Sequence, residues 1–139
     1  MKYILGMVFL SIFFTGCSIK QEVKSIDSLD SKEVCIIKND KVRDTFLEVY
    51  RNTLENKNYK VIVKEKNSND DQVCSIKSTY IANWRWDLAM YMAYAKISVF
   101  QNDKLVGEAL YDSLSGGANM GKFINADNKI KELIEELYP

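Results

Sequence analysis

The chain has 139 residues, with 19 Lys plus Arg against 19 Asp plus Glu, and it contains no histidine. A single folded domain is the default at this length. The balanced charge argues against a nucleic-acid partner, because neutralising phosphates needs a basic surface. The missing histidine excludes Ser-His-Asp and Cys-His catalysis and also histidine-ligated zinc or haem. We therefore expect no catalytic residues and no cofactor.

The first 16 residues have the layout of a secretory signal peptide, because Lys2 precedes a mostly apolar run over 3–14. That run is shorter than the roughly 18 to 20 apolar residues that a membrane span requires. The sequence FTGC at 14–17 resembles a bacterial lipobox, after which a signal peptidase cleaves and Cys17 receives acyl chains such as palmitate. An ordinary signal peptide with a nearby cysteine is the alternative. The lipobox predicts attachment to a membrane by lipid, without a span.

The residues after Cys17 indicate a location and a tether. Ser18 stands where the sorting rule of Gram-negative lipoproteins reads Asp as retention in the inner membrane. In a source with two membranes, the outer membrane is therefore favoured, with the domain facing the periplasm or the cell surface. Residues 17–32 are polar and lack aromatic side chains, which is the composition of a flexible tether. We expect the globular domain over 33–139.

The first half of this domain alternates strands with one helix. Residues 33–38 form a short β-rich run that ends in Asn39-Asp40, either of which can cap a helix. One apolar stripe at helical spacing then predicts a helix that ends near residues 56–58. Its members are Val42, Phe46, Val49, Tyr50 and Leu54. Alternating apolar and polar residues predict strands over 59–64 and 73–87.

The second half begins with an ambiguous segment over 88–101. Its Ala, Leu and Met residues favour a helix, but Ile97, Val99 and Phe100 lead into a turn at 102–103 and favour a strand. We interpret it as a strand, with a further strand over 105–114. A last helix follows the glycine-rich loop. Its apolar residues are Phe123, Ile130, Leu133, Ile134 and Leu137. The order β-α-β-β-β-β-α predicts an α+β fold, with two helices on one face of a mainly antiparallel twisted sheet.

Several short motifs resemble a family of small bacterial lipoproteins of unknown function. They are WRWDLAMYMAYA at 84–95, GEALYD at 107–112, a glycine pair at 116–117 and KF at 122–123. The resemblance covers nearly all of the mature domain and implies a lipoprotein with a strand hairpin over 73–101. It implies no particular activity. In architecture the chain is loosely similar to other envelope lipoproteins with helices on a sheet, such as the lipopolysaccharide-assembly lipoprotein.

Two cysteines remain once Cys17 is assigned to the lipid. Cys35 and Cys74 both fall in predicted strands, in a compartment that permits oxidation. A disulfide between them is one interpretation, and two buried reduced thiols are the alternative. A metal site is not expected, because two thiolates without histidine or further cysteines do not supply four ligands.

The candidate binding surface is an aromatic cluster on two neighbouring strands. Its rings are those of Tyr80, Trp84, Trp86 and Tyr91, with Arg85 and Asp87 beside them. Flat rings that line a groove stack on sugars, peptides or lipid tails, and they also anchor protein interfaces. Packing of the same rings beneath a helix is the alternative.

A pair of carboxylates for glycoside hydrolysis is conceivable among Asp87, Glu108 and Asp112. Their spacing does not force them together, and solvated or turn-capping carboxylates explain them more simply. The sequence thus predicts an envelope lipoprotein that is not an enzyme and whose domain binds an envelope protein partner. The alternative is a small-ligand, glycan or lipid binder that uses Trp84 and Trp86.

Overall fold

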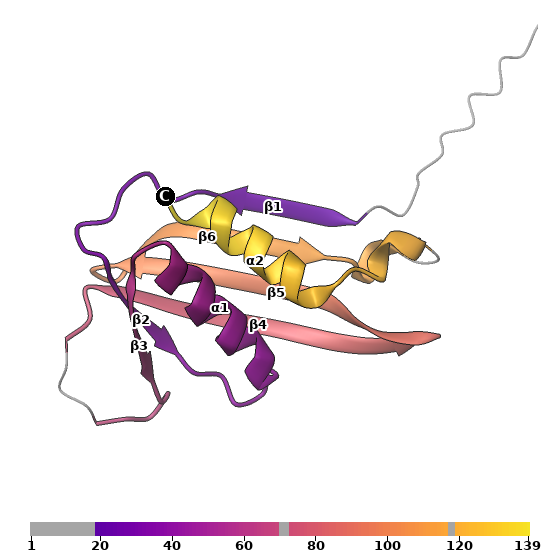
Figure 1. The fold of residues 1–139 in the computed structure, drawn as a ribbon, viewed down its shortest axis with the longest axis horizontal. Helices are drawn as coiled ribbons and strands as arrows, with labels where there is room; N and C mark the ends of the chain where they lie inside the picture. Colours follow the sequence, from indigo (N-terminus) through magenta and orange to yellow (C-terminus); the bar gives the residue numbers. More distant parts are fainter. Residues whose placement is uncertain (1–18, 70–72, 117–118) are drawn as a thin grey trace, which may run out of the picture.

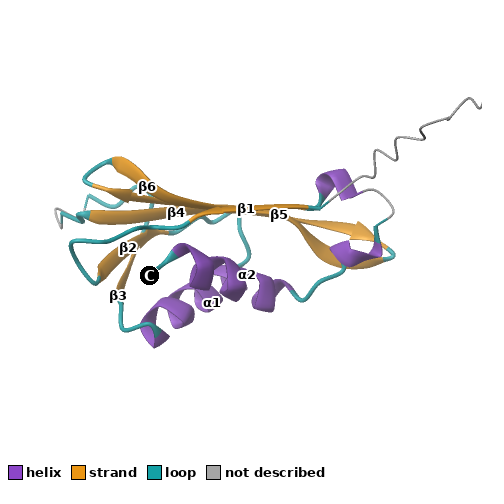
Figure 2. Cartoon of the chain, turned by 90° about the horizontal axis from the view of Figure 1, so that it is seen from above, coloured by secondary structure: helices purple, strands orange, loops and turns teal. Residues whose placement is uncertain are grey.

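A six-stranded mixed sheet carries two helices on one face, as Figures 1 and 2 show from two directions. The computed structural model describes residues 19–69, 73–116 and 119–139, so the predicted signal peptide and Cys17 lie outside the described residues. The elements are β1 (Lys20–Lys24), β2 (Glu33–Ile37), α1 (Asp44–Asn56), β3 (Lys60–Lys64), β4 (Ile76–Asp87), β5 (Ala89–Gln101), β6 (Lys104–Asp112), the 3-10 turns η1 (Leu114–Gly116) and η2 (Met120–Lys122), and α2 (Ala126–Leu137).

The strands lie in the order β1-β6-β5-β4-β2-β3. Strand β2 pairs in parallel with both β3 and β4, whereas β4, β5, β6 and β1 pair antiparallel in turn. Helix α1 forms the crossover between the parallel strands β2 and β3, which a tight turn cannot join. The predicted α+β class is confirmed, including strand formation by the ambiguous segment that precedes residue 102.

Strand β1 is the element that the sequence did not predict. Its residues lie where a flexible tether was expected, but they pair with β6 from Lys20 opposite Asp112 to Lys24 opposite Glu108. Past the strand, Ile26 is buried and its backbone N–H donates to the Leu137 carbonyl at 2.9 Å. The tether prediction is therefore wrong for residues 20–24. An edge strand with one covered face needs few apolar residues, so its sequence carries only a weak pattern.

Gly107 in β6 allows the chain after β1 to approach the sheet. A Cβ at this position would overlap Ile26 Cγ1 and would lie 3.0 Å from Leu137 Cδ1. We expect Gly107→Ala to lower the free energy of unfolding by about 1 to 3 kcal/mol, which is the usual effect of overpacking a core. Urea denaturation measures this change.

Gly116→Ala is the matched control for that substitution. The nearest atom to its added Cβ is Ile19 Cγ1 at 3.3 Å, so a smaller loss of stability is expected. Equal stability of Gly107→Ala and the unsubstituted protein would contradict the close packing of Ile26 on β6.

Both helices start differently from the sequence prediction. Helix α1 begins at Asp44, with Arg43 at its N-cap and no side-chain cap. Asn39 does not cap it, because its amide donates to the Tyr80 carbonyl and its Oδ1 accepts from the Lys41 N–H. Helix α2 is capped by Asn125, whose Oδ1 accepts from Asn128 N–H at 2.9 Å. Phe123 therefore precedes this helix and is not part of its apolar face.

The core between sheet and helices contains a buried set of hydroxyl groups. The Tyr50 hydroxyl on α1 is hydrogen-bonded to the Ser78 hydroxyl on β4 and, at 2.7 Å, to the Tyr138 hydroxyl. Burial raises the pKa of Tyr50 and the pKa of Tyr138, because the phenolate would lose its hydration. Next to this set, the Phe46 ring stacks on the Tyr80 ring with centroids 5.0 Å apart. These polar groups are satisfied inside an otherwise apolar layer.

Candidate functional site

The β4–β5 hairpin reaches beyond the other strands at one end of the sheet (Figure 1). The last paired row on that side joins Lys20 of β1 to Asp112 of β6 and Asp112 to Tyr94 of β5. From Tyr94, β5 extends back to its start at Ala89, which is about 16 Å at roughly 3.3 Å per residue. The turn residue Leu88 has a positive φ of 61°. In the part of the chain that the structure describes, β6 pairs with β5 only from Tyr94 onward and β2 pairs with β4 only at Lys77 and Ser78, so this end of the hairpin has no further strand beside it.

A register shift marks the point where the hairpin leaves the sheet. Asn83 pairs with Tyr94 but Trp84 pairs with Met92, so one residue of β5 has no partner on β4. Such a bulge bends the strands and increases their local twist. Beyond it, Trp86 pairs with Met90. Directly opposed residues point to the same face of a sheet, so these two side chains lie side by side.

The aromatic residues of this region divide between interior and surface. Trp84 is half-buried beside the core, and the Arg43 guanidinium lies 4.8 Å from the centroid of its ring. Trp86 is 72% exposed, Met90 is 51% exposed and Leu88 is 83% exposed. The hairpin therefore carries exposed apolar side chains at and beside its turn.

Two of the predicted binding residues have buried rings. Tyr80 lies in the core, where its hydroxyl accepts from the Asn39 N–H at 3.1 Å. Tyr91 packs edge-to-face on Phe123 with centroids 5.5 Å apart. Arg85, Trp86 and Asp87 are exposed and Trp84 is half-buried, and a binding role for all six residues stays a prediction.

Lys122 of η2 ties the loop after β6 to the hairpin. Its side chain is only 5% exposed and forms an ion pair with Asp87, which is 53% exposed. The same ammonium group lies 5.3 Å from the ring centroids of both Tyr91 and Phe123, a range for cation–π attraction. Lys122 stands in the KF motif at 122–123, but its contact with Asp87 was not predicted, because a single lysine after a glycine-rich loop does not indicate its partner.

The turns η1 and η2 place further apolar residues at the hairpin end. Met120 in η2 is 66% exposed, and its turn is held to the hairpin by Lys122. We call the four most exposed apolar residues of this end the hairpin-tip patch. They are Trp86, Leu88, Met90 and Met120.

The start of β1 packs on the same two turns. Ile19 side-chain atoms lie 3.3 Å from the position of a Cβ on Gly116 and 3.5 Å from that of a Cβ on Gly121. A continuous set of contacts thus leads from Ile19 through η2 to Asp87 of the hairpin. The start of β1, both turns and the end of the β4–β5 hairpin that carries its turn occupy one end of the molecule (Figure 2).

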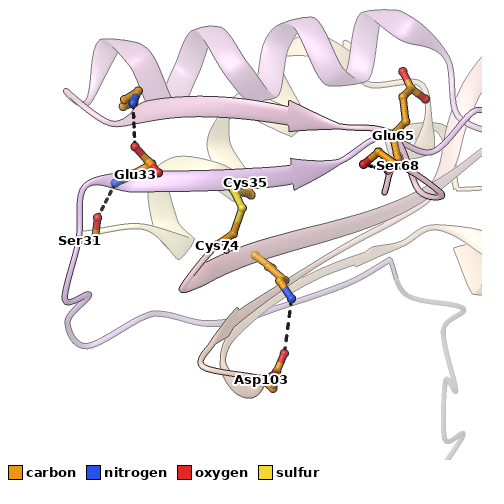
Figure 3. Close-up of a disulfide and its surroundings, with 9 residues drawn as sticks. Ser31, Glu33, Cys35, Glu65, Ser68, Cys74 and Asp103 are labelled. Carbon is orange, nitrogen blue, oxygen red and sulfur yellow. Dashed lines mark hydrogen bonds and ion pairs between the residues drawn. A yellow bond between two sulfur atoms is a disulfide. The ribbon is translucent and has the colours of Figure 1, made fainter. Parts of the chain in front are cut away.

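Cys35 of β2 and Cys74, which precedes β4, form a disulfide (Figure 3). Their Cα atoms are 6.1 Å apart, and both residues are buried. The bridge joins β2 to the chain just before β4. Cys17, the predicted lipid site, lies outside the described residues.

A surface hollow of about 190 Å³ lies away from the hairpin tip. It is lined by Ile37 at the end of β2, by Asn39 and by Tyr80 of β4, among others. Among residues 19–69, 73–116 and 119–139, no group of three or more Cys, Asp and Glu side chains could hold a metal ion. No helix in these same ranges is both long enough and apolar enough to cross a membrane.

The arrangement defines a class of architecture, namely an α+β domain with a six-stranded mixed sheet and two helices on one face. A solved structure with a similar fold is the dodecamer of a PelC point variant from Paraburkholderia phytofirmans, with a TM-score of 0.57. The sequences are 12% identical, and the match covers 86% of this chain and 95% of that chain. No protein-family model matches the chain, and no curated protein matches its sequence. At this identity the likeness shows the fold alone, and membership of the lipoprotein family stays a prediction.

Proposed function

We propose that the protein is a lipid-anchored, non-catalytic accessory module of the bacterial envelope that works by binding other protein chains. The observation that carries this proposal is the likeness of its fold to PelC, over nearly the full length of both chains and in a structure described as a dodecamer. The lipobox at 14–17 supports the anchor, and the disulfide between Cys35 and Cys74 suits an oxidising envelope compartment.

The carboxylates considered for hydrolysis each have a local structural partner. Asp87 pairs with Lys122, Glu108 pairs with Lys96 at 3.3 Å, and Asp112 accepts from the Leu114 N–H at 2.8 Å. Partners of this kind explain the carboxylates as parts of the hairpin and turn structure. This arrangement favours a binding module over a hydrolase.

The edges of the sheet support association between chains. In the part of the chain that the structure describes, β1 and β3 are the outer strands. An outer strand presents backbone N–H and C=O groups that a further strand can pair with. Other copies of this chain are therefore suitable partners, along with different envelope proteins.

Expression of the full chain in a Gram-negative host tests the proposal. We expect the protein in the membrane fraction, with an intact mass that shows loss of residues 1–16 and addition of acyl chains to Cys17. In mild detergent, light scattering should give a protein mass above that of one chain, or crosslinking in cells should yield one defined complex. Cys17→Ala is the control that loses acylation. An unmodified cysteine, or an acylated protein that stays monomeric and uncrosslinked, contradicts the proposal.

The second candidate function is binding of glycan or lipid fragments, and the 72% exposure of Trp86 is the observation that favours it. An exposed indole ring can stack on a sugar face. Titration with peptidoglycan fragments should then change the tryptophan emission of the unsubstituted protein and leave that of Trp86→Ala unchanged. If the tryptophan emission of neither protein changes during the titration, binding of peptidoglycan fragments by Trp86 is excluded.

A further inference from the structure

We propose that the hairpin-tip patch inserts into the surface of the same bilayer that holds the acyl chains of Cys17. The domain would then contact the membrane at two places, through its lipid and through the hairpin. This inference rests on the proposed lipid anchor and adds a membrane-contact site on the folded domain.

The direction of the strands brings the anchor toward the patch. Strands β1 and β5 are both antiparallel to β6, so they run in the same direction. Strand β5 starts at the hairpin turn, and therefore β1 also starts, at Lys20, on the side of the sheet nearest that turn (Figure 1). Ile19, the first described residue, packs against η1 and η2 and so lies at the same end of the domain as the hairpin turn.

The length of chain available places the bilayer close to the hairpin. Three residue steps join Lys20 to Cys17, and they span at most about 11 Å. The hairpin extends about 16 Å past the row of Lys20. The covalent link to the lipid is thus shorter than the projection of the hairpin. A bilayer that holds the acyl chains of Cys17 lies within reach of Leu88.

The chemistry of the patch suits the membrane interface. Tryptophan prefers the boundary between lipid headgroups and acyl chains, and Trp86 stands beside Met90 and next to the turn at Leu88. The carboxylate nearest this turn, Asp87, is already engaged by the Lys122 ammonium. Arg85 is exposed on the same strand and can meet lipid phosphates.

The position of helix α1 explains why the side chains of Trp86 and Met90 are exposed to solvent. Trp84 and Met92 lie on the core side of the hairpin, where Arg43 at the start of α1 covers the Trp84 ring. Trp86 and Met90 continue the same face by one further pair, beyond this cover. The face of the sheet that forms the core therefore continues to Trp86 and Met90, at the end of the domain nearest the predicted lipid site.

Fluorescence of the acylated full chain in vesicles tests the inference. The Trp84→Phe variant leaves Trp86 as the only tryptophan, and the Trp86→Phe variant leaves Trp84. In vesicles that contain brominated phosphatidylcholine, we expect Trp86 to lose most of its emission and to shift to the blue. The half-buried Trp84 should lose little.

Two further substitutions show whether the quenching depends on the hairpin tip. In the Trp84→Phe background, Leu88→Asp should restore most of the Trp86 emission, because it places a charge at the turn. Leu105→Asp is the matched control, because Leu105 lies in β6 at the end of the sheet opposite the hairpin turn, and it should leave the quenching unchanged.

The outcomes separate this inference from the proposed function. If mass spectrometry shows acylated Cys17 but brominated lipid does not quench Trp86, the membrane contact of the hairpin is wrong and the anchor stands. Trp86 protected from both brominated lipid and aqueous iodide would instead indicate a protein partner or a second copy on the patch, and would also overturn the inference. Absence of acyl chains on Cys17 overturns both.

Discussion

Reduction of the Cys35–Cys74 disulfide is expected to lower the free energy of unfolding by about 4 kcal/mol, the value that the loop-entropy model gives for a loop of this length. The two cysteines are 39 positions apart in the sequence. The bridge therefore restricts the unfolded chain across α1, β3 and the loop that follows. Urea denaturation with and without dithiothreitol measures the difference between the two midpoints.

A double variant provides the control for this measurement. Cys35→Ala combined with Cys74→Ala should match the reduced protein in stability and should not respond to dithiothreitol. A midpoint of the unsubstituted protein that reduction does not move would contradict the stabilising role of the bridge.

Above pH 10, the free energy of unfolding is expected to fall more steeply with pH than the loss of surface charge alone would cause. Burial raises the pKa values of Tyr50 and Tyr138 in the folded state, whereas in the unfolded state both ionise near pH 10. Their contribution to stability is thus complete below pH 10 and is lost as the pH rises toward the folded-state values. Each tyrosine should remove about 1.4 kcal/mol of stability per pH unit in that range. Urea denaturation at pH 8 to pH 12 measures the slope.

Tyr138→Phe separates this effect from the general alkaline loss of lysine charge. The variant keeps the hydrogen bond between Tyr50 and Ser78 but removes one buried ionisable hydroxyl. Its slope above pH 10 should be smaller by the share of one tyrosine. Equal slopes for the variant and the unsubstituted protein would show that Tyr138 does not carry the dependence.

The elements that could be predicted from the sequence are those with one buried face, because burial of one face makes apolar residues recur at the spacing of a helix or a strand. The stripe from Val42 to Leu54 predicted the body of α1, and the alternation from Ile76 onward predicted β4. Strand β1 was missed because an edge strand depends on pairing with β6, which lies far away in the sequence. The parallel pairing of β2 was missed for a similar reason, because the sequence of one strand does not indicate which strands pair with it.

The candidate site shows the same limit at the level of single residues. Tyr80, Trp84 and Trp86 are alternate residues of β4 and therefore point to the same face of the sheet. Helix α1 covers only the first part of this face. Tyr80 thus lies against Phe46 in the core, while Trp86 lies beyond the helix. The roles of Arg43 and Lys122 depend on contacts between distant segments, so no local pattern indicates them.

The pairing of β1 with β6 also determines how the domain would respond to mechanical force. A pull on the chain that precedes Lys20 acts along β1, at right angles to its hydrogen bonds with β6. All of these bonds then share the load, whereas a force across the strand would open them one at a time. Gln21 adds side-chain links to Lys129 and Glu132 of α2. The strand nearest the predicted anchor is thus attached in a shear geometry, which resists detachment when the envelope moves relative to a bound partner.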